Sequence, residues 1–100
     1  MILLLLLLSV SSYDGIIPET TISAIVIGRT GCSACVKMEP IVKELQNEQY
    51  NIYYTKDNDI RKRYNIYAVP TTIILEEGEE INRIEGFLSR DKLIKLLGKK

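Results

Sequence analysis

The chain contains no histidine and only two cysteines. Without histidine the usual general base is missing, so serine or cysteine hydrolase triads and histidine metal sites are excluded. One cysteine pair cannot supply the four soft ligands of a zinc or iron–sulfur site, and only a dimer sharing a cluster would provide them. We therefore expect no bound metal or cofactor, and any chemistry belongs to the thiols.

The chain also lacks net charge, long apolar runs and internal repeats. Thirteen basic and thirteen acidic residues balance, and no basic stripe is interleaved with aromatics, so we expect no nucleic-acid partner. The apolar run Ile2–Leu8 is far shorter than the about 20 residues that cross a bilayer, so we expect no membrane span. A chain of 100 residues without a linker predicts a single domain over 1–100, and we expect a monomer.

The apolar run leaves two interpretations of residues 1–10. A secretory signal is one, because small residues follow the run, but no Lys or Arg precedes it. The opening strand of the domain is the other, because a buried parallel strand also has a continuous apolar sequence. Composition alone does not decide between them.

The two cysteines, Cys32 and Cys35, lie where the apolar run Ala24–Ile27 gives way to a helical pattern. A helix that begins within such a pair points unpaired N–H groups at the first sulfur, which favours the thiolate there. We therefore predict that Cys32 is the attacking thiol and Cys35 the resolving thiol. A purely structural role is disfavoured, because closing so short a loop removes only about 2 kcal/mol of unfolded-state entropy.

Strand-like and helical segments alternate along the chain, which predicts an α/β fold. We expect a mixed, mostly parallel sheet with helices on both faces, closed by an antiparallel hairpin around a loop at 76–79. We expect strands at 22–27, 52–55, 71–75 and 80–84, and helices at 11–17, 33–50 (with a kink at Pro40), about 58–64 and 90–97. The cluster Asp57-Asn58-Asp59 is expected to cap the helix at about 58–64, and Ser89 the last helix.

The ordered set of motifs resembles the thioredoxin family over nearly the whole chain. The cysteine pair after its strand looks like the family's active-site loop, Pro40 like its kink proline, residues 64–71 like its cis-proline segment, and residues 86–89 like the start of its last helix. The resemblance implies a thioredoxin-like fold and a thiol–disulfide oxidoreductase that reduces disulfide-containing proteins. The disulfide between the two cysteines would be its redox-active centre, and an external reductase such as a thioredoxin reductase would be its partner.

The resemblance also implies a substrate-binding site. It implies a cis bond before Pro70, which leaves the Val69 backbone free to pair with an extended substrate segment. Gly31 and Gly86 are the other expected substrate-binding residues. The resemblance favours the opening strand over a leader at 1–10, and with it a cytoplasmic protein. A secreted or periplasmic protein is the alternative.

Three departures from the family pattern affect the expected chemistry. Gly31 stands where the family usually has Trp, and Ser33-Ala34 replaces the usual Gly-Pro, which changes redox poise. Val26 stands where many members carry a buried acid, so no side chain is identified as the proton acceptor for Cys35, although Lys56 or a water is a candidate.

Three alternative functions follow from the same residues. They are an extracytoplasmic disulfide oxidase or isomerase, a glutaredoxin-like protein, and a redox-inactive peptide-binding module. A glutaredoxin should show Thr-Val-Pro and a paired glycine near its last helix, whereas this chain has Ala68-Val69-Pro70 and the single Gly86.

Overall fold

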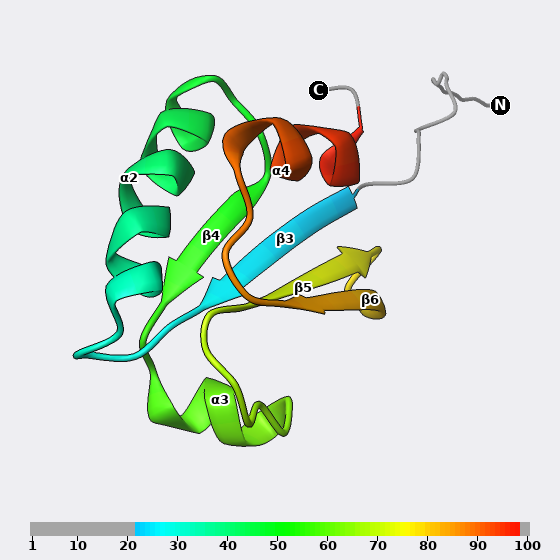
Figure 1. Cartoon of the computed structure of the whole chain (residues 1–100). Helices are drawn as coiled ribbons and strands as arrows, with labels where there is room; N and C mark the ends of the chain where they lie inside the picture. The colour runs from blue at the N-terminus through cyan, green and yellow to red at the C-terminus, as the bar shows by residue number, and fades with distance from the viewer. Residues whose placement is uncertain (1–21, 99–100) are drawn as a thin grey trace, which may run out of the picture.

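The computed structural model describes residues 22–98, which fold as a sheet flanked by helices (Figure 1). The described elements are β3 (Ile22–Ile27), α2 (Ser33–Asn47), β4 (Ile52–Thr55), α3 (Asn58–Arg63), β5 (Thr71–Glu76), β6 (Glu79–Glu85) and α4 (Arg90–Leu97). The predictions for residues 1–10 and for a helix at 11–17 lie outside the described residues. Within 22–98, no helix has both the length and the apolar character needed to cross a bilayer.

The described sheet has the strand order β4-β3-β5-β6. β3 is parallel to β4, but β3 with β5 and β5 with β6 are antiparallel pairs. The sheet is therefore mixed, and the prediction of a mostly parallel sheet is wrong for the described strands. The reason is the length of α3, because six residues of helix extend only about 9 Å and do not carry the chain back along the sheet. β5 consequently starts at the end where β4 stops (Figure 1).

Helices cover both faces of this sheet, as predicted. Alternate side chains of β3 point to opposite faces, so Ala24 and Val26 face α2 and α4 while Ile27 faces the other side. The larger core joins the sheet to buried side chains of α2 and of the α4 segment, namely Met38, Val42, Leu45, Leu88, Leu93 and Leu97. The smaller core contains Ile66, Ile73 and Leu75, with Ile60 and Tyr64 packed against it. The α/β thioredoxin-like fold class is confirmed.

Helix α2 follows the cysteine loop, residues 28–32, and continues through Pro40. Its buried positions recur at helical spacing, which fixes it against the sheet. It ends at Asn47 rather than near Tyr50, because Gln49 adopts a left-handed φ of 75°. The Gln49 N–H donates to the Gln46 carbonyl at 3.0 Å and the Tyr50 N–H to the Leu45 carbonyl at 3.0 Å, which satisfies the last carbonyls of the helix.

The closing hairpin has a tighter turn than predicted. Only Glu77 and Gly78 lie between the strands, with φ values of 51° and 87°. Two successive left-handed residues match the twist of the flanking strands, so each strand extends by one residue into the expected loop. Within the expected cap cluster it is Asp57 that caps α3, since its carboxylate accepts from the Asp59 N–H at 2.7 Å. The expected Ser89 cap is confirmed, since its hydroxyl accepts from the Lys92 N–H at 3.3 Å.

Candidate functional site

The two cysteines form a disulfide at the start of α2. Their Cα atoms lie 5.2 Å apart, and Cys32 is the N-cap residue of the helix. The Cys32 sulfur accepts a hydrogen bond from the backbone N–H of Cys35 at 3.1 Å. The helix therefore already provides the donor that would stabilise a thiolate on Cys32.

The two sulfur-bearing residues differ in exposure. Cys35 has no exposed surface, whereas Cys32 is half-buried and the neighbouring Ser33 is exposed. A large disulfide substrate can therefore reach Cys32 but not Cys35. This difference agrees with the roles expected for the attacking and resolving thiols.

The other expected site residues lie at the same end of the sheet as the cysteine loop. Ile27 at the end of β3 is the partner of Thr71 at the start of β5, so Pro70 and the loop after β3 lie at the same end of the sheet. The Val69–Pro70 peptide bond is cis. Residues 64–70, between α3 and β5, form the proline loop. The Pro70 carbonyl accepts from the Gly86 N–H at 2.8 Å, which joins the chain after β6 to this loop. Figure 1 shows the loop after β3, the loop before β5 and the chain after β6 at the end of the sheet where β3 and β4 stop.

Gly31 also lies in this region, within the loop between β3 and α2. Its φ is 86°, a left-handed conformation that glycine adopts without a steric penalty. The space around it is open, because a Cβ placed there meets no other atom within 4 Å. The absence of the family's large apolar residue at this position therefore leaves the approach to Cys32 uncovered.

Sequence reasoning missed three exposed apolar side chains in the segments that form the site. Val36 follows Cys35, Tyr67 lies in the proline loop, and Phe87 follows Gly86, with exposed fractions of 64%, 91% and 48%. Their signal in the sequence was only their adjacency to motif residues. Apolar side chains left in water beside a reactive pair are typical of a protein-binding surface.

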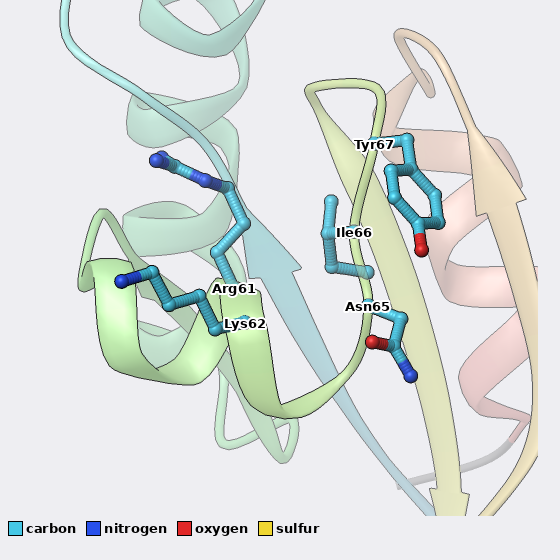
Figure 2. Close-up of a pocket in the computed structure, with 5 residues that line it drawn as sticks. All are labelled: Arg61, Lys62, Asn65, Ile66 and Tyr67. Atoms are coloured by element: carbon cyan, nitrogen blue, oxygen red, sulfur yellow. The ribbon is translucent and has the colours of Figure 1, made fainter.

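A cavity of about 270 Å³ lies on the α3 side of the proline loop. Its lining residues are Arg61, Lys62, Asn65, Ile66 and Tyr67. Figure 2 shows Arg61 and Lys62 pointing away from Asn65 and Tyr67, with Ile66 between the two groups. The cationic ends therefore lie on the opposite side of Ile66 from Asn65 and Tyr67.

The surroundings of Cys35 contain no carboxylate at the β3 position. Val26 is fully buried there, and Lys56 is exposed on the loop after β4. Over the described residues, no group of three or more Cys, Asp or Glu side chains is arranged to hold a metal ion.

Comparisons with known proteins agree with this geometry. Residues 19–100 match the family model described as a thioredoxin-like domain. The chain is 30% identical over 73 residues to a thioredoxin of Chlamydia trachomatis, covering 68% of this chain and 72% of that protein. It is 25% identical over 100 residues to a thioredoxin of Staphylococcus epidermidis, covering 89% and 90%.

Solved structures show the same fold. The reduced thioredoxin pre-protein of Schistosoma mansoni is 26% identical and superposes with a TM-score of 0.65. The match covers 77% of this chain and 76% of that protein. The oxidised mitochondrial thioredoxin 3 of Saccharomyces cerevisiae is 23% identical, with coverages of 79% and 78% and a TM-score of 0.62.

The fold, the disulfide at the start of α2 and the matched thioredoxins together make this protein a thiol–disulfide oxidoreductase. The chain belongs to the thioredoxin-like family, as the sequence resemblance predicted. The redox-active disulfide joins Cys32 and Cys35.

Proposed function

We propose that this protein reduces disulfides in other proteins, with Cys32 as nucleophile and Cys35 as resolving thiol. The observation that carries the proposal is the difference between the two residues. The half-buried Cys32 sulfur accepts the helix N–H, while Cys35 is inaccessible to solvent. An accessible thiol whose thiolate accepts a helix N–H is the one that reacts first with an external disulfide.

The reaction proceeds by two exchanges. The Cys32 thiolate attacks one substrate sulfur, the substrate S–S bond breaks, and the released substrate thiolate takes up a proton. Cys35 then loses its proton to solvent and attacks the Cys32 sulfur, and the second substrate thiolate leaves. Two electrons pass from the dithiol to the substrate, and an external reductase such as a thioredoxin reductase returns them.

We propose that the substrate segment lies extended against the proline loop. The Val69 backbone pairs with it, as a strand is added to a sheet edge, and Pro70, Gly31 and Gly86 shape the space beside Cys32. Val36, Tyr67 and Phe87 supply the apolar contact area that the family's missing Trp would have provided.

We place the protein in the cytoplasm as a monomer, where a reductase keeps the dithiol reduced. The support is the expectation that residues 1–10 form the opening strand. A reductase requires a reduction potential well below the about −120 mV of a strong dithiol oxidant.

Insulin reduction with dithiothreitol as electron donor tests this function. The wild-type protein should accelerate insulin precipitation, and Cys32→Ser should abolish the acceleration. Cys35→Ser should accumulate covalent mixed disulfides, because the resolving exchange is lost.

Three results would contradict the proposal. Full turnover by Cys35→Ser would refute the two-thiol mechanism. An inactive wild-type protein that still binds extended peptides would indicate a binding module. A potential near that of a strong oxidant would indicate disulfide formation outside the cytoplasm.

A further inference from the structure

The resolving exchange requires an anionic sulfur in an apolar place. Cys35 is wholly buried, and burial among apolar groups disfavours the thiolate. Many relatives in the family have a carboxylate nearby, but the corresponding Val26 offers no polar atom. Some other group has to favour ionisation of Cys35 if the second exchange is to be fast.

The side chain of Tyr54 lies beside Cys35. Tyr54 on β4 is the partner of Val26 on β3, and it packs against the core beneath α2. Just after the end of β3, Gly28 is buried between this ring and the start of α2. A Cβ on Gly28 would collide with the Tyr54 hydroxyl and would lie 3.0 Å from the Cys35 Cβ. The phenol and Cys35 therefore border the same small space, which exists because residue 28 is glycine.

The Tyr54 hydroxyl is available as a donor. It makes no hydrogen bond to any side chain or backbone group of the described residues. Burial raises the pKa of Tyr54 above its ordinary value, and the nearby Glu39 carboxylate on α2 raises it further. The phenol consequently keeps its proton at neutral pH and can donate it in a hydrogen bond. Val26 on β3 and Gly28 just after it carry no titratable group, and Glu39 on α2 is the charged group that shifts the pKa of Tyr54.

We propose that Tyr54 is a positioning residue that donates a hydrogen bond to the Cys35 thiolate whenever the disulfide is open. This inference rests on the proposed roles of the two thiols. The phenol keeps its proton throughout, and the proton of Cys35 goes to solvent. Once Cys35 attacks the Cys32 sulfur, the new S–S bond removes the negative charge from Cys35 and the hydrogen bond ends. Tyr54 thus takes over, with a neutral donor, the assistance that a buried acid gives in many relatives.

Stopped-flow reaction of the reduced full-length chain with the chromogenic disulfide DTNB separates the two exchanges. Cys32 releases the first thionitrobenzoate, and attack by Cys35 on the resulting mixed disulfide releases the second. Tyr54→Phe removes one oxygen atom. Tyr53→Phe is the matched control, because Tyr53 is the adjacent residue of β4 and its side chain is 54% exposed.

We expect Tyr54→Phe to slow the second release about tenfold at neutral pH and to shift its pH profile upward by about one unit, because hydrogen bonds to charged groups are the strong ones. The first release should stay unchanged, and Tyr53→Phe should match the wild type in both phases. Equal second-phase rates and pH profiles in the two variants would overturn the inference. A wild-type protein with no second release would instead overturn the proposed two-thiol function.

A second measurement reports the ionisation of Cys35 directly, without the exchange reaction. In the Cys32→Ser background, alkylation of the single remaining thiol against pH reports the ionisation of Cys35. Adding Tyr54→Phe should raise the pH at which alkylation reaches half its maximum rate, while adding Glu39→Gln should lower it. A merely structural role of the ring would leave this midpoint unchanged.

Discussion

Two adjacent threonines at the start of β5 differ in what their hydroxyls contact. Both side chains are almost completely buried. The Thr71 hydroxyl donates to the Ala68 carbonyl at 2.6 Å and so ties the proline loop to the strand. The Thr72 hydroxyl is buried without a hydrogen-bond partner among the described residues. The same substitution at the two positions should therefore have opposite effects.

We expect Thr71→Val to lower the free energy of unfolding by about 1 kcal/mol, because a hydrogen bond is lost. Thr72→Val should raise it by about 1 kcal/mol, because an unpaired polar group leaves the core. Urea unfolding midpoints at constant slope measure both changes. Destabilisation by both substitutions would show that the Thr72 hydroxyl is satisfied in solution, by a buried water.

At the same residue scale, the parts of the site that the sequence predicted are local motifs. Cys32 and Cys35 are three apart in the chain, so their helix-capped arrangement follows from the local pattern. Tyr54 could not be placed in this way, because its position beside Cys35 depends on the register of β4 against β3. The space at Gly28 is likewise visible only once those strands and α2 are packed together.

At the scale of elements, helix α3 depends on its cap more than the longer helices do. It has six residues and no fully buried side chain, so packing contributes little to it. The Asp57 carboxylate satisfies the Asp59 N–H at 2.7 Å. The proline loop follows directly from this helix, so its position depends on the helix being formed.

Replacing the cap tests this dependence. Asp57→Ala should lower the free energy of unfolding by about 1 kcal/mol, and Asp57→Asn should retain most of it, because Asn is an equally good cap. Hydrogen exchange of the α3 amides should become faster in Asp57→Ala than in Asp57→Asn. Equal exchange in the two variants would mean that tertiary contacts, and not the cap, hold α3.

The elements themselves were largely predictable, and their ends less so. β3, β4 and α4 have the predicted bounds. The apolar and β-branched residues mark the two strands, and the helix begins at its Ser89 cap and ends before Gly98. The end of α2 depended on a left-handed glutamine, and the hairpin turn on a left-handed glutamate beside Gly78. Neither residue type signals that conformation, so both boundaries were misplaced. The direction of β5 was missed because it depends on how far α3 carries the chain.

At the scale of the whole molecule, residues 1–8 decide between a cytoplasmic and an exported protein. If they form the opening strand, deleting them removes several buried aliphatic side chains, each contributing about 1.5–3 kcal/mol. That total exceeds the marginal stability of a small domain, so the truncated protein should be unfolded or insoluble.

Two measurements check this prediction. The melting curve of the truncated form should show no cooperative transition, and the intact mass of the protein from its native cells should include residues 1–8. A stable truncated domain, together with a native chain beginning near Ser12 or Tyr13, would contradict the opening strand. It would also move the function toward disulfide formation or isomerisation outside the cytoplasm.

One of the two outermost described strands, β6, bears on how these molecules meet one another in crowded solution. It pairs with β5 alone among the described strands, and nearly all of its side chains are exposed. Glu79, Glu80, Arg83 and Glu85 place charge along this border, and the Arg83 guanidinium is held by Glu80 at 2.6 Å. A second molecule that approached to extend the sheet would bring like charges together and strip them of water. The charged hairpin therefore disfavours fibrillar growth along this border.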